Sequence, residues 1–369
     1  MEKLWKYKKI GEVCIVERGA SPRPIDKYIM DNESGINWIK IGDTSDSMYI
    51  TETAQKIIVE GMKKSRYVKP GDFLLSNSMS FGRPYILKID GCIHDGWLVL
   101  RDENALFDKR FLYYYLSSKT TYKKLKSMAV GGVVNNLNSE MVRNVIVPVP
   151  DKEEQSEIAD LFDKIKKILD DRKQELEQLD TLVKSRFVEM FGDIITGKYN
   201  YKIRKLGDVA FIGSSHRVFT TEFVESGIPF YRGTEIGELA NGIEPSEPYY
   251  ISEEHYNKLT KDNTKPRIGD LLMPSICNKG QIWMVDTDRP FYYKDGRVLC
   301  ISPNRDIFNS KYLEYFMRIK TLVEYPKLGS GSTFAEFKIF LLKDMDVLVP
   351  PRNVQNQFAD FVASVDKSK

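Results

Sequence analysis

Several residue types and motifs on which enzymes depend are scarce or missing in this chain of 369 residues. Its three histidines, His94, His216 and His255, are too far apart to predict a metal cluster, and its four cysteines include no Cys-x-x-Cys pair. The chain also lacks a Gly-x-x-x-x-Gly-Lys-Ser/Thr phosphate loop, a Gly-x-Gly-x-x-Gly nucleotide fingerprint and an Asn-Pro-Pro-Tyr-type motif for holding a flipped base. We therefore expect no catalytic, cofactor-binding or metal-binding residues and no disulfide framework.

Long apolar runs are also absent. No segment approaches the roughly 18 apolar residues that are needed to cross a membrane. The N-terminus, Met1 to Lys6, lacks the apolar stretch of a signal peptide. With 42% hydrophobic and 29% charged residues, the composition is that of a globular protein. We expect a cytoplasmic location and no membrane partner.

The charge of the chain is unevenly distributed. Residues 151–190 contain 12 acidic and 8 basic residues, a net charge of −4; because the whole chain has +3, the remaining residues carry +7. A DNA ligand requires a positive bias of this kind, since neutralising phosphates releases counterions. An ordinary, mildly basic surface explains the same numbers, and charge alone favours that second interpretation.

The chain does contain a duplication with an offset of about 200 residues. A period this long indicates two copies of a whole domain and not a solenoid of small repeats. Two similar domains suggest two similar ligands, or one ligand with two similar halves. The matching segments are Ile10–Val13 with Leu206–Val209, Gly71–Leu75 with Gly269–Met273, Asp95–Gly96 with Asp295–Gly296, Val147–Pro150 with Val347–Pro350, and Ile158–Phe162 with Phe358–Val362.

The strongest secondary-structure prediction is a helix from about Glu153 to Met190. Its apolar residues recur at intervals of three and four and so repeat every seven positions, while its other positions are rich in charge. At 1.5 Å per residue such a helix extends about 55 Å, too long for one small domain, so a partner helix must cover its apolar face. The predicted packing residues are Ile158, Phe162, Ile165, Leu169, Leu176, Leu179 and Val183 in this helix, with Phe358, Phe361 and Val365 in a similar helix of the second copy.

That second helix begins in residues 351–369 and is truncated. The chain stops at Lys369, where the first copy continues its pattern for roughly 20 residues. A natural truncation and an artificially shortened chain both explain the difference. Apolar residues of the first helix, among them Leu176, Leu179 and Val183, would then be exposed, which predicts self-association.

Outside these helices both copies have the pattern of mixed α/β domains. Short β-forming runs are separated by Gly, Asp, Asn and Ser turns, and Asp108 and Asn309 are each placed to cap one amphipathic helix. The predicted fold class is therefore mixed α/β, with two tandem globular domains joined by a long, coiled-coil-forming helix. The predicted boundaries are 1–150 for the first domain, 151–191 for the long spacer helix, 192–202 for a connector, 203–350 for the second domain and 351–369 for the truncated helix.

Two short features could suggest catalysis. His94-Asp95 could be half of a proton relay, but the second copy has Lys294-Asp295 at these positions, which favours a structural Asp-Gly turn. The segment 336–338, Glu-Phe-Lys, has the form of the end of a nuclease motif, but no paired upstream aspartate is evident. We therefore predict that the chain is not an enzyme by itself.

The end of each domain carries a resemblance to a known family. The pattern Pro-x-Pro-x-x-x-Glu-Gln-x-x-Ile, which enters the long helix, stands as Pro148, Pro150, Glu154, Gln155 and Ile158. Together with segments 76–83, 93–100 and 131–138, it resembles the specificity subunit of type I restriction-modification systems, over nearly the whole chain. The second copy departs from the pattern, with Val354 in place of Glu and Phe358 in place of Ile.

The resemblance implies a non-catalytic subunit that binds double-stranded DNA. In that family each globular domain is a target recognition domain for one half of a split site, and the helices set the gap and dock methyltransferase subunits. We expect two methyltransferase subunits, with restriction subunits as further partners. S-adenosylmethionine, ATP and Mg would be bound by those partners and not by this chain. A helix of about 55 Å can hold two domains on major-groove faces more than one duplex turn, roughly 34 Å, apart.

Candidate DNA-contacting residues are sought where the two copies differ. Positions that match should be scaffold, whereas polar positions that differ on equivalent loops could contact different half-sites through base edges and phosphates. For each of them a solvated loop residue is an equally good interpretation. The candidates are Arg18, Ser21, Arg23, Lys40, Asn77, Ser78, Arg83 and Asn135 in the first copy, and His216, Arg217, Arg232, Ser275, Asn278, Lys279, Gln281 and Ser332 in the second.

Two other functions are compatible with the sequence. The chain could be a single-chain DNA methyltransferase or endonuclease whose active site has none of the motifs above, or a truncated assembly scaffold that does not read sequence. Modification or hydrolysis of DNA by the purified chain alone would support the first, and equal affinity for all duplexes would support the second.

Overall fold

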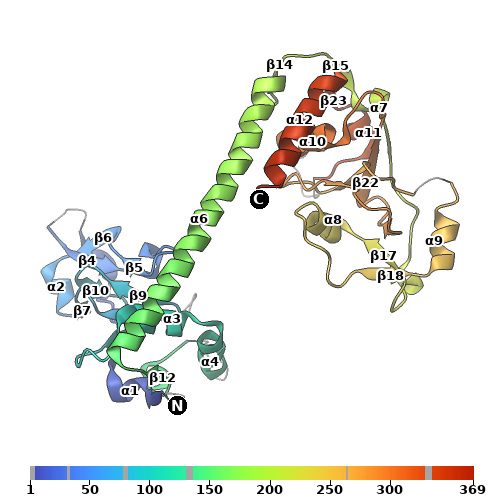
Figure 1. Ribbon diagram of the computed structural model, residues 1–369. Coiled ribbons are helices and arrows are strands. Elements are labelled where there is room, and N and C mark those ends of the chain that lie inside the picture. Colours follow the sequence, from blue (N-terminus) through green and yellow to red (C-terminus); the bar gives the residue numbers. More distant parts are fainter. Residues whose placement is uncertain (1–4, 31–33, 78–81, 130–135, 263–264, 329–334) are drawn as a thin grey trace. The chain divides into compact units, whose positions relative to one another are not determined.

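The structure is a computed structural model that describes residues 5–30, 34–77, 82–129, 136–262, 265–328 and 335–369 (Figure 1). The chain divides into two compact units, Met1–Arg172 and Lys173–Lys369. One long helix, α6 (Lys152–Phe191), begins in the first unit and ends in the second. The mixed α/β fold and the long helix are confirmed. Because the unit boundary falls within α6, the predicted domain limits remain predictions.

Two sheets and a strand pair form the β-structure of the first unit. One sheet consists, in order, of β2 (Ile15–Arg18), β11 (Trp97–Arg101), β8 (Phe73–Ser76), β9 (Pro84–Leu87) and β5 (Tyr49–Ile50). The other consists of β3 (Ile29–Met30), β6 (Gln55–Ile57), β4 (Ile36–Ile39), β10 (Gly91–Ile93) and β7 (Arg66–Val68). β1 (Lys6–Lys9) pairs antiparallel with β12 (Ile146–Val149), so the two ends of the domain meet.

Helices cover these sheets in the first unit. They are α1 (Ile10–Val13), α2 (Val59–Met62), α3 (Lys109–Ser117), α4 (Lys119–Ala129) and α5 (Ser139–Arg143). The predicted cap of α3 is confirmed, because the Asp108 carboxylate accepts a hydrogen bond of 2.8 Å from the Arg110 backbone N–H. Ser118 has an extended backbone and divides this region into two helices, α3 and α4, where the sequence predicted one.

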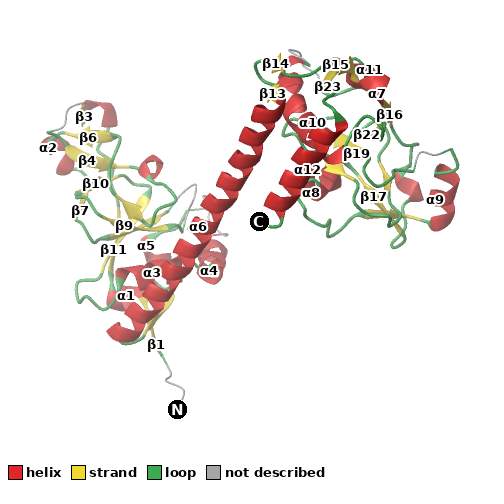
Figure 2. Cartoon of the chain, turned by 45° about the horizontal axis from the view of Figure 1, so that its top comes forward, coloured by secondary structure: helices red, strands yellow, loops and turns green. Residues whose placement is uncertain are grey.

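The second unit repeats this topology with fewer strands (Figure 2). Its larger sheet has the order β16 (Ala210–Gly213), β22 (Val298–Pro303), β19 (Leu271–Pro274) and β20 (Trp283–Met284), equivalent to β2, β11, β8 and β9. Its smaller sheet has the order β18 (Tyr249–Ile251), β17 (Ile228–Tyr231) and β21 (Tyr292–Tyr293), equivalent to β6, β4 and β10. Two further antiparallel pairs are β15 (Ile203–Lys205) with β23 (Asp346–Leu348), equivalent to β1 with β12, and β13 (Gly192–Asp193) with β14 (Lys198–Tyr199).

The helices of the second unit also have counterparts in the first. They are α7 (Leu206–Val209), α8 (Gly233–Leu239), α9 (Glu253–Leu259), α10 (Ser310–Glu324), α11 (Ile339–Lys343) and α12 (Arg352–Asp366). As predicted, Asn309 caps α10: its side chain accepts hydrogen bonds from the backbone N–H groups of Lys311 and Tyr312. The repeated topology agrees with the duplication in the sequence.

The C-terminal half of α6 packs against α10 and α12 within the second unit (Figure 2). Phe187 and Phe191 are fully buried, with the Phe187 ring 5.3 Å from that of Phe358 and the Phe191 ring 4.8 Å from that of Tyr312. Val183 is also buried in this core. The burial of Phe187 and Phe191 was not predicted from the sequence. Residues 183, 187 and 191 are each four positions apart, whereas the predicted seven-residue repeat alternates spacings of three and four.

The predicted packing residues of α12 lie in the same core. Phe358 and Val365 are buried, and Phe361 is partly buried against them. Because Val183 is only 4% exposed and Leu179 is partly covered, the prediction that these two residues are exposed for self-association is wrong.

The N-terminal half of α6 buries only its first turns. Ile158 is partly buried against the core of the first unit. The other predicted packing residues before Leu179 are largely exposed, between 43% and 64%; they are Phe162, Ile165, Leu169 and Leu176.

Candidate nucleic-acid interface

Four of the predicted DNA-contacting residues in the first unit converge on one aspartate. The Asp95 carboxylate accepts a hydrogen bond of 2.9 Å from the Ser21 hydroxyl and pairs with the Arg23 guanidinium at 3.4 Å. The Asp95 main-chain oxygen accepts from Arg18 Nε at 3.0 Å and from Asn77 Nδ2 at 2.8 Å. These groups come from two segments, residues 18–23 and Asn77, so the Asp-Gly turn gathers side chains that are far apart in the sequence.

The same turn fixes the electrostatics of the cluster. Burial alone would raise the pKa of the Asp95 carboxyl, but the hydrogen bond from Ser21 and the neighbouring backbone and His94 groups lower it, so Asp95 is ionised at neutral pH. Burial lowers the pKa of His94, so its ring is neutral at pH 7 and accepts a hydrogen bond from the Ile41 backbone N–H at 3.2 Å. This role of His94 is structural and agrees with the interpretation of Asp95-Gly96 as a turn.

Lys40 and Arg83 are held by partners other than Asp95. Lys40 lines a cavity of about 440 Å³ together with Ser21 and Arg23, and its ammonium donates to the Gln55 side chain at 2.7 Å. The Arg83 guanidinium pairs with Asp46 at 3.2 Å.

An equivalent but different cluster surrounds Asp295 in the second unit. Asp295 accepts from Arg217 Nε at 3.2 Å, and the following Gly296 N–H donates to the Ser214 hydroxyl at 2.8 Å. His216, which the sequence placed in the same loop, pairs with Asp262 at 2.6 Å. The turn aspartate therefore holds an arginine of the neighbouring loop in both units, while the surrounding side chains differ.

Asn77 and Ser275 occupy matching positions and are each 1% exposed. The main-chain carbonyl of Asn77 accepts a hydrogen bond from the Leu137 N–H at 3.0 Å, and the main-chain carbonyl of Ser275 accepts one from the Phe337 N–H at 2.7 Å. In this structure both residues position their loops from the inside. They do not present a side chain at the surface.

Arg232 is also committed to an internal contact. Its guanidinium forms an ion pair with Glu235, which is only 4% exposed in the first turn of α8. The Glu235 carboxylate in turn accepts from the Arg232 backbone N–H at 2.8 Å, so this pair closes the start of the helix.

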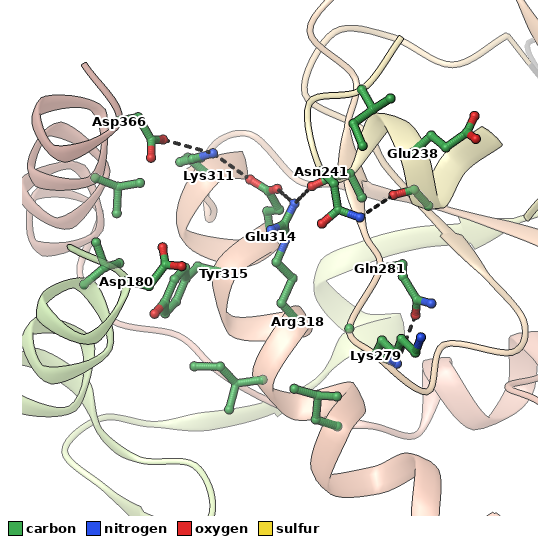
Figure 3. A pocket seen from close by; sticks show the side chains of 18 of the residues that line it. Asp180, Glu238, Asn241, Lys279, Gln281, Lys311, Glu314, Tyr315, Arg318 and Asp366 are labelled. Atoms are coloured by element: carbon green, nitrogen blue, oxygen red, sulfur yellow. Dashed lines mark hydrogen bonds and ion pairs between the residues drawn. The ribbon is translucent and has the colours of Figure 1, made fainter. Parts of the chain in front are cut away.

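Asn278, Lys279 and Gln281 lie on a loop beside a cavity of about 760 Å³, and Lys279 and Gln281 line it (Figure 3). Asn278 and Lys279 are exposed, and the Lys279 N–H donates to the Gln281 side chain at 3.0 Å. The loop is anchored from α10, because Arg318 donates to the carbonyl oxygen of Ile282 at 2.9 Å.

A chain of ion pairs links Arg318 of α10 to α12 (Figure 3). Arg318 also donates to the carbonyl oxygen of Ala240 at 2.7 Å and pairs with Glu314 at 2.8 Å. Lys311 joins Glu314 at 3.1 Å to Asp366 of α12 at 3.8 Å. Arg318, which holds the loop, is therefore connected to α10 and α12, the helices that pack against the C-terminal half of α6. The role of Arg318 was not predictable from the sequence, because a lone arginine in a helix forms no recognisable pattern.

Three predicted residues, Ser78, Asn135 and Ser332, lie outside the described residues. No group of three or more His, Cys, Asp or Glu side chains that could hold a metal ion occurs within the described ranges. In the part of the chain that the structure covers, no helix is long and apolar enough to span a membrane.

Comparison with known proteins agrees with the fold and the duplication. Residues 2–179 match the family model described as the type I restriction modification DNA specificity domain. The specificity subunit of the type I restriction enzyme MjaIX from Methanocaldococcus jannaschii is 23% identical over 384 residues, which cover 98% of this chain and 86% of the relative.

Two solved structures have a similar fold. A chain in a structure of complex assembly and conformational transition of the type I R-M system has a TM-score of 0.59 at 17% identity, covering 99% of this chain and 90% of that one. The S subunit of the type I restriction-modification system from M. genitalium has a TM-score of 0.56 at 15% identity, covering 100% and 90%. The chain is thus similar over nearly its whole length to type I restriction-modification specificity subunits, and its residues 2–179 match the DNA specificity domain of that family.

Proposed function

We propose that this chain is the non-catalytic DNA-recognition subunit of a type I restriction-modification complex and that each unit reads one half of a bipartite duplex site. The observation that carries this proposal is the pair of Asp-Gly turns. Asp95 and Asp295 occupy equivalent positions in two units of the same topology, yet they hold different sets of polar side chains. A common scaffold with different polar loops is what two unlike half-sites require.

The chemistry of the clusters suits DNA. Arginine and lysine contact phosphates and the major-groove edge of guanine, and serine, asparagine and glutamine donate to and accept from base edges. Exposed members, such as Arg23, Lys279 and Asn278, are placed to contact DNA directly. Buried members, such as Asn77 and Ser275, would act by holding the loops in place.

The helices supply the surface for partner subunits. The exposed apolar residues of α6 from Phe162 to Leu176 would be covered by methyltransferase subunits, two of which fit two recognition units. S-adenosylmethionine, and ATP with Mg where a restriction subunit takes part, would be bound by those partners in the cytoplasm.

Reconstitution tests this function. The chain is expressed with its methyltransferase subunit in cells that lack other adenine methylation, and modified adenines are mapped across the genome. We expect one split motif with a constant gap. Omission of this chain is the control and should abolish the pattern.

A domain exchange tests the modular assignment. Replacing residues 1–150 with the first domain of another specificity subunit should change one half of the motif, and replacing residues 203–350 should change the other half. A change in both halves after a single exchange would contradict the assignment. Equal binding to all duplexes without any motif would indicate a scaffold, and methylation or cleavage by the chain alone would indicate an enzyme.

A further inference from the structure

The second unit contains a basic cavity of about 280 Å³ that differs from the equivalent region of the first unit. The cavity lies between α9, the residues that lead into β19, and the connection from β20 to β21. Lys265, Arg267 and Arg289 line it together with Tyr256, and Asp288 is the acidic residue among its described lining. Three cations and one acid give the cavity a net positive charge.

Three cations without an ion pair line this cavity. In the part of the chain that the structure describes, Lys265, Arg267 and Arg289 form no ion pair. Tyr256 also lines the cavity, but its hydroxyl is buried. Three unpaired cations around one cavity are suited to an anion with several acceptor oxygens.

The first unit has lysines at two of the matching positions, Lys69 for Arg267 and Lys88 for Asp288, but differs at the others. Matching α2 to α9, and the adjoining strands to one another, places Met62, Tyr67 and Ile89 at the positions of Tyr256, Lys265 and Arg289. There the Tyr67 hydroxyl donates to the Asp90 carboxylate, so the equivalent region is closed by its own acid. The second unit thus has one tyrosine and two cations where the first has three neutral residues, and its described residues include no counterpart of the strand β7 that holds Tyr67.

We propose that this cavity binds a phosphate group of the DNA backbone beside the half-site read by the second unit, an inference that rests on the proposed function. Lys265 and Arg267 also line a neighbouring cavity of about 470 Å³ that reaches Ser214, two residues before His216. The basic side chains therefore adjoin the candidate recognition loop. An arginine supplies several N–H donors to phosphate oxygens, and lysine adds a point charge.

The salt dependence of duplex binding tests this site. The full chain and the double variant Arg267→Ala/Arg289→Ala are titrated with a fluorescently labelled 40-base-pair duplex at several salt concentrations. We expect about tenfold weaker binding at roughly 0.1 M salt, and a slope of log affinity against log salt reduced by about 1, as for one lost phosphate contact. The matched control removes two exposed lysines of β1 in the first unit, Lys6→Ala/Lys8→Ala, and should change the affinity less than threefold.

Inorganic phosphate distinguishes a free anion from DNA. If inorganic phosphate raises the melting temperature of the wild-type chain but not of the arginine variant, and the DNA salt slope is unchanged, the site takes a free anion and the DNA assignment is wrong. Unchanged affinity and slope in a folded arginine variant would also overturn the assignment while leaving the proposed function intact. Absence of duplex binding by the wild-type chain would instead contradict the proposed function.

Discussion

A buried glutamine at the start of each domain-closing helix should be a main determinant of stability in each unit. The Gln155 side chain is fully buried, and its carbonyl accepts from the Asp108 N–H at 2.8 Å. Its amide donates to the main-chain oxygens of Leu106 at 3.0 Å and Pro150 at 2.9 Å. One side chain thus ties together the cap of α3, the end of β12 and the start of α6.

The magnitude follows from these contacts. Gln155→Leu keeps the volume of the side chain but removes three hydrogen bonds and leaves their backbone partners unpaired. At about 1 kcal/mol for each bond, the first unit should lose about 3 kcal/mol of its free energy of unfolding. Gln355 makes the same three contacts in the second unit, with Asn309 N at 2.9 Å, Ile307 O at 2.9 Å and Pro350 O at 2.8 Å. Gln355→Leu should therefore cost the second unit a similar amount.

Hydrogen exchange measured by mass spectrometry separates the two effects, because peptides from each unit report its own opening. Gln178→Leu, at an exposed position of α6, is the control and should change either unit by less than about 0.5 kcal/mol. A loss of less than 1 kcal/mol in the free energy of unfolding for both buried variants would mean that the hydrogen bonds of the glutamines do not stabilise the units.

Three further predictions concern other parts of the molecule. Phe187→Ala should lower the free energy of unfolding of the second unit by about 3–5 kcal/mol, whereas Phe162→Ala, at a position 44% exposed, should cost about 1 kcal/mol or less; urea denaturation checks both. Burial raises the pKa of the Cys14 and Cys300 thiols to about 12, so both should react slowly with a thiol reagent at pH 8 until the chain is denatured; rapid labelling of the native protein would contradict their burial. Arg318→Lys keeps a charge beside Glu314 but lacks the planar guanidinium whose Nη2 donates to both carbonyl groups, so it should relax sequence preference in the second half of the motif only, as methylation mapping would show.

The sequence predicts elements whose determinants are local. The long helix has a repeating apolar pattern, and Asp108 and Asn309 cap helices because short polar side chains accept from free N–H groups. The burial of Phe187 was not predictable in this way, because it depends on the rings of α10 and α12, which the pattern of α6 does not reveal.

The candidate site is less predictable because its contacts are not local. Arg18 and Asp95 are 77 positions apart, and they meet only because β2 pairs with β11. The duplication in the sequence predicted both Asp-Gly turns, but not which side chains form hydrogen bonds with them. The sequence likewise does not distinguish Arg232 from the exposed arginine candidates. Its ion pair with Glu235 depends on the start of helix α8, which the structure reveals.

The way the loops are held explains how two similar units can read different DNA. In the first unit, Arg18 and Asn77 donate to the main-chain oxygen of Asp95, an acceptor that any residue at that position would supply. The strands and the buried glutamines Gln155 and Gln355 repeat between the units with the same contacts. A scaffold that relies on main-chain acceptors and repeated buried contacts tolerates replacement of its loop side chains. Each half-site can therefore change without loss of the fold.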